Sequence, residues 1–162
     1  MIIKGMIDED FVNYRHPSMT IMMPRCTFKC GKQACQNSTL ANSTDISIDP
    51  QNIITRYLQN QITKAIVFSG LDPLDTAEDV VRTIRLLRER GCTDDVVIYT
   101  GYTEEEVCEK TIDGIPFLEY AQKHFAPLVI KYGRYVPNQQ PHYDEVLGVT
   151  LASDNQYARR YE

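Results

Sequence analysis

Short apolar runs alternate with helical patterns along most of the chain, and this alternation restricts the fold more than any other feature. The apolar runs AIVF (residues 65–68), VVIY (96–99) and LVIK (128–131) have the length and composition of buried strands. Between the first two runs, residues 76–90 carry apolar side chains at helical spacing and end before a glycine. Strands that alternate with helices and are joined by short loops indicate an α/β fold, with a mostly parallel sheet and flanking helices.

Local signals predict further elements of the same alternation. Asp49 and Pro50 form a helix start, with a capping residue followed by proline at the first helical position. Thr103 and Glu106 form a capping box for a helix that runs to about residue 110. The remaining predictions are a strand at 18–23, a polar loop at 31–45, a helix at 117–123 and a last strand at 146–151.

Length and composition indicate one globular domain, residues 1–162, without repeats or low-complexity linkers. The net charge of −5 argues against a dedicated nucleic-acid-binding protein, which normally carries a basic face. No apolar run approaches the length of a membrane span. The first residues turn acidic early and resemble neither a signal peptide nor a transit peptide, so we expect a cytoplasmic protein without membrane contact.

Three of the five cysteines, Cys26, Cys30 and Cys35, lie within the ten residues CTFKCGKQAC. An odd number of cysteines without a secretion signal makes a disulfide framework improbable. Cys92 and Cys108 are expected to be plain thiols. Clustered thiolates are the soft ligands that zinc, copper(I) and iron–sulfur clusters prefer.

The count of three leaves several kinds of site open. A closed zinc site needs a fourth ligand, and neither His16 nor Cys92 has a recognisable spacing for it. A cubane iron–sulfur cluster normally takes four cysteines, so three leave one iron with an open position for a small molecule. Unrelated loop thiols are the third possibility.

Polar motifs follow the predicted strands at the ends where chemistry collects in parallel sheets. They are the cysteine loop at 26–35, SGLDP at 69–73, TGY at 100–102 and SDNQ at 153–156. Their common position indicates a single site.

These residues carry a resemblance to a known family. A strand leading into a CxxxC loop with a third cysteine resembles the radical S-adenosylmethionine (radical SAM) enzymes, and among these the activating proteins of the anaerobic ribonucleoside-triphosphate reductase. Five segments resemble that family's motifs in order: CQN at 35–37 (Cys-Tyr-Asn), SGLDPL at 69–74 (SGGDPL), IYTGYT at 98–103 (YTGYT), YGRY at 132–135 (Asp-Gly-Arg-Phe) and SDNQ at 153–156 (Ser-Ser-Asn-Gln). The chain differs in its CxxxCxxxxC spacing, where the superfamily has CxxxCxxC, and in Leu71, where the family has glycine.

The resemblance implies a partial, open β/α barrel of the radical SAM type with a [4Fe–4S] cluster on Cys26, Cys30 and Cys35. It implies that S-adenosylmethionine binds the fourth iron and is cleaved reductively to a 5′-deoxyadenosyl radical. That radical would generate a glycyl radical on the large subunit of an anaerobic ribonucleotide reductase, with a flavodoxin or ferredoxin as electron donor.

The resemblance also implies a set of residues that bind S-adenosylmethionine: Ser69, Gly70, Asp72, Pro73, Thr100, Tyr102, Asn155 and Gln156. Asp72 and nearby carbonyls could receive the methionine ammonium, although an aspartate before proline is also a common turn residue. Thr100 and Tyr102 could reach a ribose, or could be a loop threonine and a packing tyrosine.

The other expected contacts also have plain structural alternatives. Asn155 and Gln156 could hold a carboxylate or an adenine edge, or could lie in a surface loop. Arg134 could pair with a carboxylate or face a partner, and Arg159 and Arg160 are expected in a solvated tail. The three histidines share no spacing and receive no catalytic role.

Two other functions stay open at this point. The longer cysteine loop is compatible with a radical SAM enzyme that acts on another peptide or small molecule. Leu71 favours an iron–sulfur or zinc-binding interaction module without catalysis.

Overall fold

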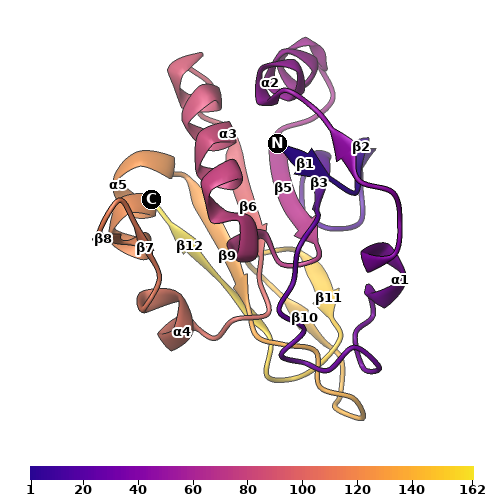
Figure 1. Cartoon of the computed structure of the whole chain (residues 1–162). Coiled ribbons are helices and arrows are strands. Elements are labelled where there is room, and N and C mark those ends of the chain that lie inside the picture. The colour runs from indigo at the N-terminus through magenta and orange to yellow at the C-terminus, as the bar shows by residue number, and fades with distance from the viewer.

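A six-stranded sheet forms the centre of the protein, as a computed structural model of residues 1–162 shows (Figure 1). Its order is β12-β9-β6-β5-β3-β2. The strands are β2 (Gly5–Asp10), β3 (Ser18–Met23), β5 (Ala65–Gly70), β6 (Asp95–Tyr99), β9 (Leu128–Tyr132) and β12 (Tyr157–Tyr161). The four central strands are parallel, and the two edge strands β12 and β2 are antiparallel to their neighbours.

Register across the central strands gives each face of the sheet its own row of apolar side chains. One row pairs residues that pack into the larger hydrophobic cluster: Ile21, Phe68, Ile98 and Ile130. The preceding positions of three of these strands belong to a smaller cluster on the opposite face: Val67, Val97 and Val129. Burial on both faces explains why these strands read as continuous apolar runs in the sequence.

Three helices cover the face of the larger cluster (Figure 1). They are α2 (Pro50–Gln59), α3 (Ala77–Glu89) and α5 (Phe117–Phe125). Each lies in a connection between neighbouring parallel strands, and the central strands follow one another in chain order. Crossovers of one hand that always advance in the same direction place their helices on the same face.

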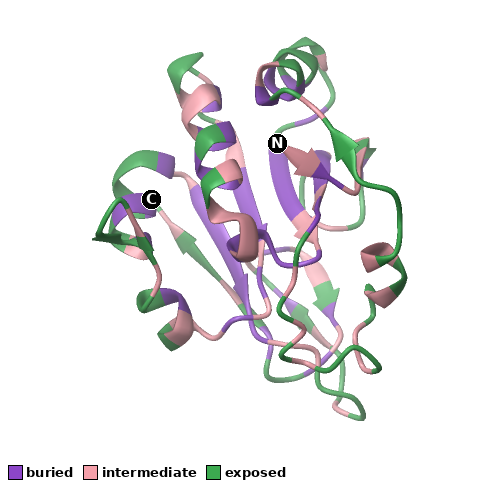
Figure 2. Cartoon of the chain, in the orientation of Figure 1, coloured by how far each residue is buried: buried purple, intermediate pink, exposed green.

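The opposite face is covered by a hairpin of β10 (His142–Asp144) and β11 (Val149–Leu151), whose Leu147 and Leu151 join the smaller cluster. Figure 2 shows the buried residues concentrated in the central strands and on the inner sides of the helices. The shorter elements are β1 (Ile2–Ile3), α1 (Ser38–Ala41), β4 (Ile46–Ser47), the 3-10 turn η1 (Pro73–Thr76), α4 (Glu104–Cys108), β7 (Thr111–Ile112) and β8 (Ile115–Pro116). No helix combines the length and the apolar character that crossing a membrane requires.

The mostly parallel sheet with flanking helices is confirmed, and the sheet is open, since each edge strand pairs on one side only. Two predicted helix starts are confirmed in detail. The Asp49 carboxylate accepts a hydrogen bond from the Gln51 N–H at 3.0 Å, and both bonds of the capping box between Thr103 and Glu106 are present.

Predictions near the C-terminus and in the polar loop need correction. The segment 146–151 is not the last strand, because only Val149–Leu151 is extended and it belongs to the β10–β11 hairpin. The last strand is β12, which contains the two arginines expected in a solvated tail. All five of its residues pair with β9, and Arg160 also forms an ion pair with Asp95 at 2.9 Å, so the arginines belong to an ordered edge strand. The loop predicted at 31–45 contains the single turn α1.

Candidate functional site

Loops from four parallel strands meet at the carboxyl edge of the sheet. The cysteine loop follows β3, and loops after β5, β6 and β9 end beside it (Figure 1). Together with the β10–β11 hairpin they enclose a cavity of about 750 Å³. Small-molecule sites commonly have roughly 300–1,000 Å³, so the cavity has room for a nucleoside-sized cofactor.

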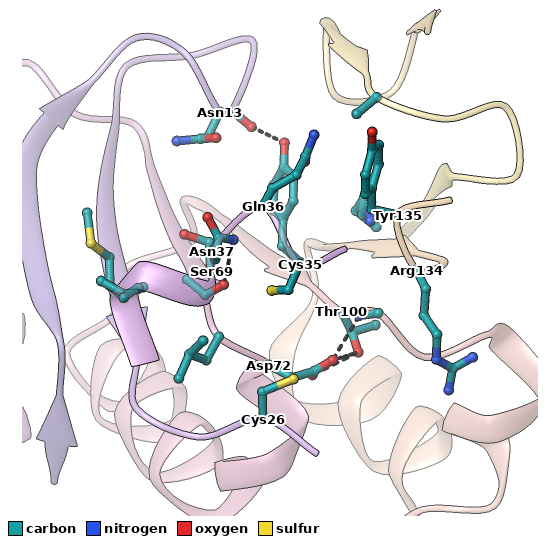
Figure 3. Close-up of a pocket in the computed structure, with 18 of the residues that line it drawn as sticks. Asn13, Cys26, Cys35, Gln36, Asn37, Ser69, Asp72, Thr100, Arg134 and Tyr135 are labelled. Carbon is teal, nitrogen blue, oxygen red and sulfur yellow. Dashed lines mark hydrogen bonds between the residues drawn. The ribbon is translucent and has the colours of Figure 1, made fainter. Parts of the chain in front are cut away.

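All three cysteines of the loop line this cavity and are half-buried. Figure 3 shows the side chains of Cys26 and Cys35 at the cavity, with Asp72 and Thr100 beside them. No group of three or more His, Cys, Asp or Glu side chains is arranged as a metal site in this structure.

The backbone of the cysteine loop turns sharply between the first two cysteines. Phe28 adopts a left-handed conformation with φ of 53°, which is rare for a bulky residue. This turn directs the Phe28 N–H to the Cys26 Sγ at 3.2 Å, and the Gly31 N–H donates back to the Phe28 carbonyl at 2.8 Å. Backbone strain of this kind persists where surrounding contacts enforce it, and such positions cluster at functional sites.

The surroundings of Cys26 and Cys30 favour the protonated form of these two thiols. Burial raises the pKa of the Cys26 thiol, and the negative charges of Asp72 and Asp75 add to the effect. Burial also raises the pKa of the Cys30 thiol, as does the neighbouring Cys35. Binding of a metal to these groups therefore has to release protons.

Asp72 joins the loops that follow β5 and β6. Its carboxylate accepts hydrogen bonds from the Thr100 hydroxyl at 2.9 Å, the Gly101 N–H at 2.8 Å and the Leu74 N–H at 3.0 Å. Burial raises the pKa of this carboxyl, and the hydrogen bonds oppose the shift. Asp72 therefore acts as the turn aspartate of η1, while its side chain lies at the cavity wall.

The structure brings most of the residues predicted to bind S-adenosylmethionine to the cavity. Five of the eight line it: Ser69, Gly70, Asp72, Thr100 and Gln156. The other three do not line it: Pro73, Tyr102 and Asn155. Gln156 has its amide committed to the protein, since it accepts from the Ala152 and Ser153 N–H groups and donates to the Gly133 carbonyl. Asn155 donates to the Arg134 carbonyl at 2.9 Å.

Sequence reasoning missed Lys131 and Tyr99, two polar residues of the cavity wall. Lys131 ends the apolar run LVIK, is buried, and donates to the Gly133 carbonyl at 2.6 Å. Burial lowers its pKa to about 8, against the opposing charge of Asp72. Tyr99 ends the run VVIY, and its hydroxyl donates to the Asn13 carbonyl at 2.5 Å. Each of these residues ends an apolar run with a side chain that carries a polar group, and this pattern is the sequence signal that could have identified them.

Asn37, two residues beyond the third cysteine, fastens the cysteine loop to the neighbouring strand. Its side-chain amide donates to the Gly70 carbonyl at 2.8 Å. The neighbouring Gln36 also lines the cavity. The loop therefore begins at the end of β3 and is hydrogen-bonded to β5 at Asn37.

The protein is thus an α/β protein in which one loop at the carboxyl edge of the sheet brings three thiols, the ligand type that soft metals and iron–sulfur clusters prefer, to one cavity. The chain belongs to the family described as 4Fe-4S single cluster domain, whose model matches residues 16–147. The matched span includes the three cysteines and all four parallel strands. A comparison with curated proteins gave no match.

The residues present fit an iron–sulfur cluster. Thiolates are its usual protein ligands, and Cys26, Cys30 and Cys35 are the thiols that would hold it, because all three line one cavity. Neither His16 nor Cys92 lines the cavity, so the fourth ligand considered for a closed zinc site is not supplied by either. When bound, such a cluster supplies one-electron redox chemistry and, with three protein ligands, one iron position for a further ligand.

Proposed function

We propose that this protein is a radical SAM enzyme that cleaves S-adenosylmethionine reductively and generates a glycyl radical on an anaerobic ribonucleotide reductase. One observation carries the proposal: in a chain of the 4Fe-4S family, three thiols, and not four, line a cofactor-sized cavity at the strand ends. A missing fourth thiolate is what the binding of a small molecule to the remaining iron requires. The order of the five sequence motifs supports the choice of reductase.

The chemistry needs one electron, which a flavodoxin or ferredoxin would supply. With that electron, cleavage of the bond between sulfur and the 5′-carbon would give methionine and a 5′-deoxyadenosyl radical, which would take a hydrogen atom from a glycine of the partner. The protein's part is to position and shield these groups. Asn37 and Asp72 fix the loops around the cavity, and the buried Lys131 offers a cationic group to an anionic part of the cofactor.

A cluster-binding module without catalysis is the second candidate. Leu71, which replaces the glycine of the resembling family, is buried and lines the cavity. The side-chain amide of Gln156, expected to contact the cofactor, is instead engaged with backbone groups of the protein. Both observations reduce the polar surface available to S-adenosylmethionine.

Anaerobic reconstitution with iron and sulfide tests the cluster. We expect four iron and four sulfide per chain, as a cubane contains, and a brown protein. Changing Cys26, Cys30 or Cys35 to alanine should abolish stable incorporation, because each removes one ligand. Cys108→Ala is the matched control, since this thiol is exposed in α4. A colourless protein with stoichiometric zinc would contradict the cluster.

Two further measurements separate the candidate functions. With dithionite as reductant, the loaded protein should convert S-adenosylmethionine to 5′-deoxyadenosine, while a binding module should release none. Co-expression with the large subunit of an anaerobic ribonucleotide reductase should then give the electron paramagnetic resonance signal of a glycyl radical on that subunit. Cleavage without this signal would point to a radical SAM enzyme with another substrate.

A further inference from the structure

Tyr102 lies outside the large cavity, yet it is the centre of a charged network beside the cysteine loop. Its side chain is 5% exposed. Three cations surround its ring: the Lys110 Nζ is 3.9 Å from the centroid, the Lys29 Nζ 5.0 Å, and the Arg134 guanidinium carbon 5.8 Å. The tyrosine hydroxyl donates to the Asp75 carboxylate at 2.5 Å. A buried aromatic face that holds several cations is a cation–π arrangement that favours fixed positions for their charges.

The network contacts the segment between the first two cysteines at two residues, Thr27 and Lys29. The Thr27 N–H donates to Asp75 at 2.8 Å, and the Thr27 hydroxyl lies 3.4 Å from the Tyr102 hydroxyl. Two residues further on, Lys29 pairs with Glu106 at 3.2 Å. Glu106 in turn accepts a hydrogen bond from Arg134 at 2.6 Å. Through these contacts α4 and η1 determine where this part of the loop lies.

A second, small cavity of about 30 Å³ is lined both by residues of this network and by two of the cysteines. Its lining includes Tyr102, Lys29 and Arg134 together with Cys26 and Cys30. The same two cysteines also line the large cavity. The cationic groups therefore share an internal surface with two of the three predicted cluster ligands.

We propose that Tyr102 is the positioning residue of the cysteine loop. It fixes the segment between the first two cysteines through Asp75, and it holds two of the cations, Lys29 and Arg134, at the small cavity that Cys26 and Cys30 also line. Nearby positive charge stabilises the reduced, more negative state of an iron–sulfur cluster and raises its reduction potential. The proposal rests on the cluster-binding part of the proposed function and is independent of S-adenosylmethionine.

Tyr102→Phe and Tyr102→Leu test the proposal in the full chain, reconstituted anaerobically with iron and sulfide. Tyr102→Phe removes only the hydroxyl, so we expect faster loss of iron to a chelator with little change in potential. Tyr102→Leu also removes the ring, so iron loss should be faster still and the midpoint potential more negative. Tyr57→Phe is the matched control, because its buried hydroxyl also donates to an aspartate, Asp94, at 2.6 Å, but it lines neither cavity.

Glu106→Gln provides a test that does not depend on the folding of the tyrosine variants. Glutamine retains the capping box but removes the charge that neutralises Arg134 and Lys29, so the midpoint potential should become more positive. The proposal is overturned if Glu106→Gln leaves the potential unchanged, or if the Tyr102 variants behave like Tyr57→Phe. A wild-type chain that retains no iron and sulfide would instead overturn the proposed function.

Discussion

Single buried charges at the strand ends make the cavity wall polar at a cost in stability. Lys131 and Asp72 are both buried. Burial lowers the pKa of Lys131 and raises the pKa of Asp72, and both shifts favour the neutral form of the side chain. Lys131 is shown with one hydrogen-bond acceptor, the Gly133 carbonyl, whereas an ammonium group has three donors. A fold selected for stability alone would place an apolar residue at this position of the strand. The lysine is therefore better explained by the cavity than by the core.

Lys131→Met tests this cost through the dependence of stability on pH. The folded-state pKa of about 8 lies below the ordinary value of 10.5, so the unfolded chain binds more protons between these values. Stability from this group should therefore rise as pH increases from about 8 to about 10.5, by on the order of 3 kcal/mol. Urea unfolding of both proteins across this range should show the difference. The methionine variant should lack this rise and be the more stable protein at neutral pH.

A parallel pH dependence in the two proteins would contradict this explanation. The comparison isolates Lys131 because the thiols with raised pKa, such as Cys26 and Cys30, titrate in both proteins.

At the scale of elements, the sequence allowed prediction of those parts whose signal is local or continuous. The runs at 65–68, 96–99 and 128–131 are visible because parallel strands covered on both faces are apolar throughout. Helix starts at Pro50 and Glu104 are visible because capping depends on a few adjacent side chains.

The edge strands could not be predicted in the same way. The strand β12 has the sequence YARRY, and most of its side chains are exposed, so it carries no apolar run. The strand β2, GMIDED, is similarly polar. Its pairing with β3, and that of β12 with β9, depend on partners distant in sequence, which local propensity does not reveal.

Gly70 at the end of β5 illustrates how closely the elements approach below the cavity. Its φ is +88°, and an added Cβ would lie 3.0 Å from the Met22 Cα of the neighbouring strand. Gly114, in the turn between β7 and β8, has a similar φ of +79° but open space around it. Gly114→Ala should cost only the left-handed conformation, about 1–2 kcal/mol. Gly70→Ala should cost about 1–3 kcal/mol more, because the strands must also move apart.

Urea denaturation of the metal-free proteins measures both costs. Equal destabilisation by the two substitutions would show that the close approach of β5 and β3 does not limit this position. The comparison also bears on the site, since Gly70 lines the cavity and its carbonyl accepts the bond from Asn37.

At the scale of the whole molecule, the position of the site was predictable and its side-chain arrangement was not. Parallel strands place their carboxyl ends at one edge, and this brought the motifs at 26–35, 69–73 and 100–102 to one place. Whether a side chain enters the cavity depends on the path of the loop after the strand. Thr100 lines the cavity, while Tyr102, two residues later, turns into the charged network. No sequence pattern distinguishes these two directions.

Loading of the site should change the protease sensitivity of the cysteine loop more than that of any other exposed segment. Arg25, directly before Cys26, and Lys29 and Lys32, between the cysteines, are exposed trypsin sites. A cluster bound at three points of one loop suppresses the local opening of that loop. Trypsin should cleave this loop several-fold more slowly in the reconstituted protein than after the iron is removed by a chelator. Cleavage at Arg90, in the exposed turn after α3, is the internal control and should not change.

The cysteine variants decide whether the protection comes from the cluster. Cys35→Ala should be cleaved at the metal-free rate under reconstitution conditions, whereas Cys108→Ala should be protected like the wild type. Equal cleavage rates with and without iron would mean that loading leaves the loop unchanged. Protection that extends to Arg90 would mean a general stabilisation, because the three ligands lie on one loop and the turn after α3 carries none of them.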